Sequence, residues 1–148
     1  MAGQEKKRLW VAVGVIENDR DQIFICQRAA RQHQAGKWEF PGGKVEPGET
    51  SEAALRREIS EELSTSLVLG ARVSSNDDGD WPLPNGSNIR IWLTELADGA
   101  PMPRLGSSHR ELRWVRAAEI SGLPWLPGDL QILPALLECF ERFECFER

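Results

Sequence analysis

Residues 36–65 read GKWEFPGGKVEPGETSEAALRREISEELST, and this stretch decides the fold of the chain. A glycine-rich turn leads directly into a segment of helical periodicity that contains Glu58, Glu61 and Glu62. Glu61 and Glu62 follow Glu58 by three and four positions, so a helix places the three carboxylates on one face. Carboxylates so close together repel one another unless a cation neutralises them, and oxygen-only ligands suit Mg²⁺ or Mn²⁺. The stretch therefore predicts a helix that carries a divalent-metal site.

The same segment has a separate apolar stripe. Leu55, Ile59 and Leu63 are spaced by four residues and can dock the helix on a core. Thr50 is a plausible N-cap, and the helix is expected to end near Leu63. An ordinary solvated acidic face is the alternative interpretation of the glutamates taken alone, but the fixed spacing after a Gly-Gly turn favours metal binding.

The complete pattern is G-x5-E-x7-R-E-U-x-E-E, where U is aliphatic, and it is filled by Gly43, Glu49, Arg57, Glu58, Ile59, Glu61 and Glu62. It closely resembles the signature of the Nudix hydrolases, which hydrolyse nucleoside diphosphates linked to another moiety. The resemblance implies an α/β fold, the Nudix α-β-α sandwich with a mixed central sheet. The chain departs from the family pattern at Ser64, where glycine is usual, and at Thr65, where an aliphatic residue is usual. A glycine there serves a left-handed helix C-cap, so the departure concerns the helix exit.

The resemblance also implies roles for single residues. The metal ligands are Glu58, Glu61 and Glu62, with Glu58 serving in the family as ligand or base, and the backbone carbonyl of Gly43 can contribute. Arg57 resembles the arginine that pairs with the residue matching Glu49 and braces the loop; the alternative is an exposed ion pair with Glu61. Lys44 is a candidate phosphate contact, or else a solvated lysine.

Many Nudix enzymes use a further acid from a distant loop. In the most similar subgroup it lies about six residues before the tryptophan that matches Trp114. Here that position is Ser108, followed by His109. Glu111 is our candidate substitute as catalytic base or ligand, and a strand-edge residue without a role is the alternative.

Residues 6–62 resemble the MutT-type 8-oxo-dGTP diphosphatases, notably in AVGVIEN, QIFI, RAA and KWEFPGGKVE. The resemblance extends more loosely through ELRWV to the closing helix. It places substrate-binding roles on Arg28, His33, Glu39 and Phe40. The alternatives are a rim charge for Arg28, a loop histidine at His33 and plain core packing for Phe40.

The residue that reads the base is an asparagine in the MutT pattern, at the start of the last helix. The matching residue here is Asp129. An ionised aspartate only accepts hydrogen bonds and favours the amino group of cytosine or adenine. A protonated one, with its pKa raised by burial, can address the edge of 8-oxoguanine. A simple helix N-cap is the alternative role.

Together these residues predict a Mg²⁺-dependent pyrophosphohydrolase that cleaves a nucleoside triphosphate into the monophosphate and pyrophosphate. The expected substrate is 8-oxo-dGTP, which implies sanitisation of the nucleotide pool and a link to DNA repair. One alternative is a pyrophosphatase for dCTP, 5-methyl-dCTP or CTP, which Asp129 motivates. The other is a catalytically silent Nudix-fold binding module.

The composition limits the class of protein. The 148 residues are 41% hydrophobic and suit one domain over residues 1–148. The net charge of −5 argues against a nucleic-acid polymer as partner, and no apolar run approaches the roughly 20 residues that span a membrane. Cys26, Cys139 and Cys145 are odd in number and lack metal-type spacing, which predicts a reduced, cytoplasmic setting. A monomer or a weak homodimer is expected.

Apolar runs predict strands at 9–16, 22–27, 67–74, 88–96 and 111–116. A short helical turn is expected at 117–120 and a second helix at 129–143, while 28–41 is expected to be a loop. The sequence ECFER at 138–142 recurs at 144–148. Residues from about 138 to 148 are therefore interpreted as a repetitive helical extension, to which we assign no function.

Overall fold

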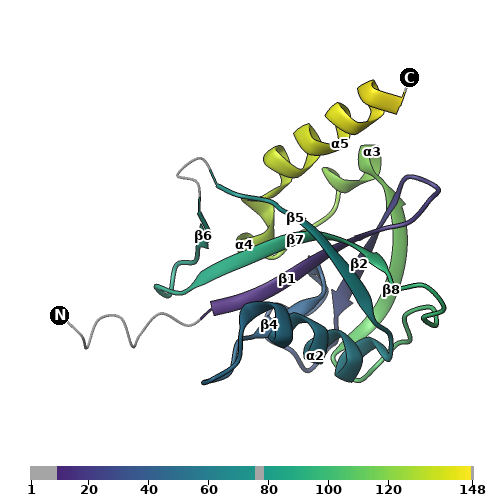
Figure 1. Ribbon diagram of the computed structural model, residues 1–148. Helices are drawn as coiled ribbons and strands as arrows, with labels where there is room; N and C mark the ends of the chain where they lie inside the picture. Colours follow the sequence, from purple (N-terminus) through teal and green to yellow (C-terminus); the bar gives the residue numbers. More distant parts are fainter. Residues whose placement is uncertain (1–9, 76–78, 148) are drawn as a thin grey trace.

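The computed structural model describes residues 10–75 and 79–147, and the side chains as far as residue 140. A sheet lies at the centre, with the helix α2 (Ser51–Leu63) on one face and α3 (Ala117–Ile120), α4 (Pro127–Leu130) and α5 (Leu133–Glu147) on the other (Figure 1). The strands are β1 (Trp10–Glu17), β2 (Gln22–Arg28), β3 (Trp38–Glu39), β4 (Gly42–Lys44), β5 (Leu67–Arg72), β6 (Trp81–Pro82), β7 (Asn88–Leu96) and β8 (His109–Arg116). The fold is the expected α/β sandwich of the Nudix type.

The sheet is mixed, as predicted. Its central order is β3-β2-β1-β7-β5, and β4, β6 and β8 add to it by pairing with β1, β7 and β2. The pair β1–β7 is parallel over its whole length, from Trp10 opposite Asn88 to Glu17 opposite Glu95. The other pairs are antiparallel.

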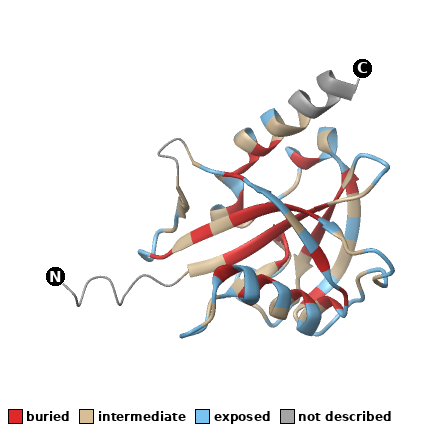
Figure 2. Cartoon of the chain, in the orientation of Figure 1, coloured by how far each residue is buried: buried red, intermediate tan, exposed pale blue. Residues whose placement is uncertain are grey.

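Two buried clusters, one on each face of the sheet, form the core. Alternation along β1 sends Val13 and Val15 to the face covered by α4 and α5, and Ala12 and Ile16 to the face covered by α2. The inner stripe of α2 is buried as predicted at Leu55, Ile59 and Leu63. Figure 2 shows buried residues concentrated along the strands and the inner side of this helix.

The two ends of α2 are fixed by local hydrogen bonds. Thr50 is the N-cap, and its Oγ1 accepts a hydrogen bond of 3.1 Å from the backbone N–H of Ala53. At the other end Ser64 takes the left-handed conformation, with φ 56° and ψ 39°, and its N–H donates to the carbonyl of Ser60. The buried Thr65 donates its hydroxyl to the carbonyl of Pro101. Ser64 thus adopts the left-handed conformation that glycine usually provides at this position. Thr65 connects the end of the helix to the loop after β7.

Most predicted elements are confirmed. The strands near 88–96 and 22–27, the turn at 117–120 and the helix from Ser51 have the expected places. The predicted loop at 28–41 contains β3, and the sequence analysis also missed β4 and β6. The predicted helix 129–143 is divided into α4 and α5, because Pro134 lacks the N–H that a continuous helix would donate to Leu130.

Some expectations fall outside the described residues. Leu9, at the start of the first predicted strand, and Arg148, at the end of the repeat, are among them. The rest of the repeated tail continues α5 (Figure 1). Within the described residues, no helix has the length and apolar character needed to cross a membrane.

Ser64→Gly should stabilise the protein, because glycine adopts the left-handed conformation without the steric cost that serine bears. We expect an increase of about 0.5–1 kcal/mol in the free energy of unfolding, measured by urea denaturation. Ser60→Gly is the matched control. It introduces glycine at a solvent-exposed position in the middle of the same helix and should lower the free energy of unfolding. Equal losses in both variants would contradict the role of Ser64 as a left-handed cap.

Candidate active site

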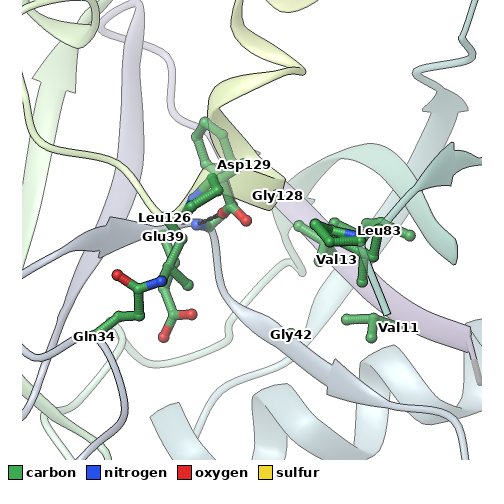
Figure 3. Close-up of a pocket in the computed structure, with 13 residues that line it drawn as sticks. Val11, Val13, Gln34, Glu39, Gly42, Leu83, Leu126, Gly128 and Asp129 are labelled. Atoms are coloured by element: carbon green, nitrogen blue, oxygen red, sulfur yellow. Dashed lines mark hydrogen bonds between the residues drawn. The ribbon is translucent and has the colours of Figure 1, made fainter. Parts of the chain in front are cut away.

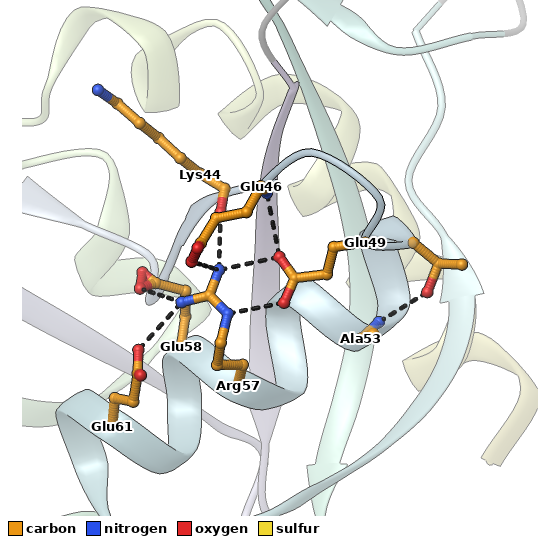
Figure 4. A network of polar contacts seen from close by, with 8 residues as sticks. Lys44, Glu46, Glu49, Ala53, Arg57, Glu58 and Glu61 are labelled. Carbon is orange, nitrogen blue, oxygen red and sulfur yellow. Dashed lines mark hydrogen bonds and ion pairs between the residues drawn. The ribbon is translucent and has the colours of Figure 1, made fainter.

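Arg57 lies at the centre of a polar network that joins α2 to the loop before it (Figure 4). Its Nε donates to Oε2 of Glu49 over 2.7 Å, and its Nη2 donates to Oε1 of the same carboxylate and to the carbonyl of Lys44, each over 3.0 Å. Its Nη1 donates to Glu61 over 3.0 Å and to Glu58 over 3.4 Å. Arg57 therefore makes both contacts that were considered for it: it pairs with Glu49 through two hydrogen bonds, and it forms an ion pair with Glu61, one helical turn further along α2.

The loop between β4 and α2 is held in place by this network. Glu49 accepts a further hydrogen bond from the backbone N–H of Glu46. The pKa of Glu49 is lowered, first by its hydrogen bond from Arg57 and then by the bond from Glu46. Lys44 contributes its carbonyl here, while its side chain is exposed and extends away from the network (Figure 4).

The glycines of the turn allow the carboxylate of Glu58 to lie against the backbone. A Cβ atom added to Gly43 would stand 1.9 Å from Oε2 of Glu58. A Cβ on Gly42 would stand 2.0 Å from the carbonyl oxygen of Ala12 on the neighbouring strand. At Gly42 the obstacle is backbone, so glycine is required there, whereas a side chain at Gly43 would displace the carboxylate of Glu58.

Glu58 and Glu62 are partly buried carboxylates with insufficient positive charge around them. The pKa of Glu62 is raised to about 7, first by burial and then by the charge of Glu58, against the opposing effect of His109. Burial is also the main cause of the raised pKa of Glu58, and Glu61 adds to it. In the described part of the chain no hydrogen bond or ion pair reaches the carboxylate of Glu62. A cation at this place would remove the repulsion.

The donor set of the helix fits a hard divalent cation. It consists of the oxygens of Glu58, Glu61 and Glu62, next to the backbone of Gly43. Among the described residues, however, no three His, Cys, Asp or Glu side chains converge on one point. Glu58 and Glu61 both turn toward Arg57, and the side chain of Glu61 is 60% exposed. Convergence on one cation therefore requires a movement of these side chains, above all of the exposed Glu61.

A second cluster of polar residues, formed by Arg28, Glu39 and His109, lies near Glu62. Nη1 of Arg28 donates to Oε1 of Glu39 over 3.2 Å, and Nε2 of His109 lies 2.9 Å from Oε2 of the same carboxylate. Arg28 also donates through Nε to the backbone carbonyl of His33, whose side chain is exposed. Arg28 and Glu39, two of the expected substrate-binding residues, are thus in direct contact, whereas His33 contributes its backbone to the group.

A cavity of about 290 Å³ lies next to Glu39. Figure 3 shows Asp129, Leu126 and Glu39 toward one end and Leu83 and Val11 toward the other. The lining residues are Val11, Val13, Gln34, Glu39, Phe40, Gly42, Leu83, Pro84, Ile89, Leu126, Pro127, Gly128 and Asp129. It is an apolar cavity with a few polar groups, as is usual for a site that binds a small molecule.

Asp129 is buried at the wall of this cavity. Its Oδ2 accepts a hydrogen bond of 2.8 Å from the backbone N–H of Phe40, and burial raises its pKa to about 7. The N-cap alternative for Asp129 is wrong, because the residue lies inside α4 and its side chain bonds to Phe40. The ring of Phe40 packs on Trp125 with 4.8 Å between centroids, so this residue serves the core as well as the cavity.

The structure does not bring Glu111 to the carboxylate helix. A β-bulge is the reason: Gln27 stands opposite Glu111, but the next residue, Arg28, stands opposite His109, which leaves Arg110 as the extra residue. His109 and Glu111 therefore point to opposite faces of the sheet. Glu111 lies on the face away from α2, where its carboxylate pairs with Arg113 over 2.7 Å. The sequence analysis chose Glu111 because it is an acid close to the family position at Ser108, and the extra residue that turns it away leaves no signal in the composition of the strand.

The sequence analysis also missed part of the cavity wall. Leu83 and Pro84 come from the segment after β6, which was read as a connecting loop. Gln34 lines the opening with a left-handed backbone, at φ 60°. The composition of 82–84 gives no sign that this segment closes on α4, where a Cβ on Gly128 would meet Leu83 at 2.7 Å.

Comparisons with known proteins agree with this geometry. The NUDIX domain family matches residues 7–136. The chain is 40% identical to the 8-oxo-dGTP diphosphatase of Escherichia coli (strain K12) over 101 residues, which are 68% of this chain and 76% of that protein. It is 34% identical to the CTP pyrophosphohydrolase of the same organism over 131 residues, 88% of this chain and 93% of that protein.

The likeness extends to solved structures. The solution structure of the Escherichia coli ORF135 protein matches this fold with a TM-score of 0.70 and 33% identity, over 89% of this chain and 90% of that one. The signature residues, the layered fold and these relatives lead to one conclusion. The chain belongs to the Nudix hydrolase family, and within it to the MutT-type pyrophosphohydrolases.

Proposed function

We propose that this enzyme is a Mg²⁺-dependent nucleoside triphosphate pyrophosphohydrolase that converts 8-oxo-dGTP to the monophosphate and pyrophosphate in the cytoplasmic nucleotide pool. One observation carries the proposal: a cavity with a buried, protonatable Asp129 at its wall is also lined by Gly42 and by Glu39, whose charge acts on Glu62 of α2. The similar 8-oxo-dGTP diphosphatase supports the same substrate class.

The residues of α2 have a defined part in this chemistry. Glu58, Glu61 and Glu62, with the carbonyl of Gly43, would hold the cation. Bound Mg²⁺ neutralises charge on the phosphates, activates water and stabilises the leaving group. Arg57 keeps the loop of Glu49 against the helix, and Lys44, whose side chain is exposed, is the proposed phosphate contact.

Asp129 is proposed to read the base. Since Oδ2 already accepts from the N–H of Phe40, a proton on Asp129 resides on the other oxygen. In that form the carboxyl group donates a hydrogen bond, as the O6 edge of 8-oxoguanine requires. Burial brings the pKa of Asp129 to about 7, so this form is well populated near neutral pH.

The second candidate substrate is a cytidine nucleotide. The ionised form of Asp129 only accepts hydrogen bonds, which suits the amino group of cytosine. The similar CTP pyrophosphohydrolase supports this alternative. Turnover of a panel containing 8-oxo-dGTP, dGTP, dCTP, 5-methyl-dCTP and CTP separates the two. A preference for a cytidine nucleotide in that panel at neutral pH would overturn the assignment to 8-oxo-dGTP.

Glu61→Gln and Glu62→Gln should each lower kcat by at least about a hundredfold at saturating Mg²⁺, because each removes a charged ligand that helps to stabilise phosphoryl-transfer charge. Pyrophosphate release measures the rate, and circular dichroism confirms the fold. Glu52→Gln is the matched control: it changes an exposed glutamate in the first turn of the same helix and should keep wild-type activity. Near-wild-type rates in both ligand variants would remove the metal-site assignment.

The preference for 8-oxo-dGTP over dCTP should fall as the pH rises from about 6 to about 8, because Asp129 loses its donor on passing its pKa of about 7. One hydrogen-bond mismatch in a desolvated pocket changes specificity roughly 5- to 150-fold. Asp129→Asn carries a donor at every pH and should hold the preference constant. The measurement is the ratio of kcat/KM for the two substrates against pH. An equal pH dependence of that ratio in wild type and variant would show that Asp129 does not read the base.

A further inference from the structure

His109 has one polar partner. Its side chain is 2% exposed, and Nε2 lies 2.9 Å from the carboxylate of Glu39. Its Nδ1 is the buried side-chain nitrogen that lacks a hydrogen-bond partner within the described part of the chain. An unpaired buried polar atom costs free energy, which an apolar ring at this position would avoid. Core packing therefore does not explain a histidine here, whereas the contact with Glu39 does.

The backbone is shaped to make that contact. The bulge at Arg110 turns His109 to the α2 face of the sheet, where Leu112 and Trp114 of the same strand also pack. Glu39 stands on the same face, opposite Cys26 of β2. Without the extra residue, His109 would share the opposite face with Glu111. Bulges commonly re-aim a side chain beside an active site, and this one aims His109 at Glu39.

Glu39 is held through both of its oxygens. Arg28, from the end of β2, donates to Oε1, and His109, from the start of β8, lies on Oε2. An ionised carboxylate offers about four acceptor positions, so two donors leave it able to accept further hydrogen bonds. Glu39 also lines the cavity and is partly exposed there. It is thus a fixed acceptor that faces the place of the ligand.

Glu39 is connected to both ends of the site. The next residue, Phe40, donates its N–H to Asp129, and Glu39 and its partner His109 both act electrostatically on Glu62. On the proposed function, the base binds at Asp129 and the phosphates at Glu62. The part of a nucleotide between them is the sugar. Sugar hydroxyls are donors that suit a carboxylate, whereas a phosphate would be repelled by it.

We infer that His109 is a positioning residue that fixes Glu39 as the acceptor for a sugar hydroxyl of the bound nucleotide. The inference rests on the proposed function, since it takes the base and phosphate ends from it. It assigns a role to the residue next to Ser108, where the family acid is missing. It also makes the 3′-hydroxyl part of what the enzyme recognises.

Calorimetric binding of nucleoside monophosphates tests this without turnover. The ligands are 8-oxo-dGMP and dCMP, each compared with its 2′,3′-dideoxy form, so that the sugar is tested independently of the base. In the wild type, loss of the 3′-hydroxyl should weaken binding roughly tenfold, as expected for a hydrogen bond to a charged group. In His109→Phe, which lacks the Nε2 donor, the same loss should weaken binding by less than about twofold.

Two further variants separate positioning from general damage. His109→Gln keeps an N–H donor near Glu39 and should restore most of the tenfold discrimination. Glu39→Gln removes the charged acceptor and should abolish it. Thermal melts establish that each variant is folded at the temperature of the titration. Because each comparison is a ratio between two ligands on one protein, a purely structural effect of the substitution cancels.

Three results would overturn the inference. One is a wild type that binds each ligand pair equally, and another is an undiminished ratio in His109→Phe. The third is a loss of discrimination in His109→Gln as complete as in His109→Phe. A failure of the proposed function looks different: the wild type would bind none of the monophosphates and turn over none of the triphosphates, which would remove both claims together.

Discussion

The guanidinium of Arg57 is the group on which the rest of the site depends. It joins the helix α2 to the loop before it through two bonds to Glu49 and one to the carbonyl of Lys44. A single exposed ion pair contributes little to stability, but a planar guanidinium that bonds one carboxylate through two nitrogens also fixes geometry. The loop in turn places Gly43 against Glu58. Loss of Arg57 would therefore release the loop and the carboxylates at once.

The same arrangement leaves Glu62 outside the reach of Arg57. Its pKa of about 7 means that the folded, metal-free protein resists ionisation of this group. Because the folded pKa is raised above the ordinary value of 4.5, Glu62 lowers the stability of the fold increasingly as the pH rises from about 4.5 to about 7. Strain of this kind is characteristic of functional sites, where a residue is kept for its chemistry at a cost to stability. The expected cation reverses that cost.

The sequence predicts those parts of the site that come from one continuous segment. The residue pattern of this segment was sufficient for the helix, its N-cap at Thr50 and the common face of the glutamates, all of which depend on local helical geometry. The contact between Arg57 and Glu49 was expected from the family resemblance. The αL conformation of Ser64 was not predicted, because the residue departs from the glycine that usually adopts it.

The parts that the sequence did not predict depend on contacts between distant segments. The bulge that separates His109 from Glu111 follows from the register of β8 on β2, which composition does not encode. The cavity forms where the segment at Leu83 meets α4, and the bond from Phe40 to Asp129 joins residues 89 positions apart. Such pairings require the folded sheet, so the structure was needed to show that His109, and not Glu111, lies on the α2 face beside Glu39.

The central claim is that the carboxylates of α2 form a cation site that is unfavourable when empty. The most direct measurement is the melting temperature of wild type and Glu62→Gln at pH 8, in EDTA and in excess Mg²⁺. In EDTA the variant should melt a few degrees above the wild type, because the ionised, half-buried carboxylate is gone. Mg²⁺ should stabilise the wild type by mass action and the variant much less. A variant that melts below the wild type in EDTA and gains equally from Mg²⁺ would contradict the claim.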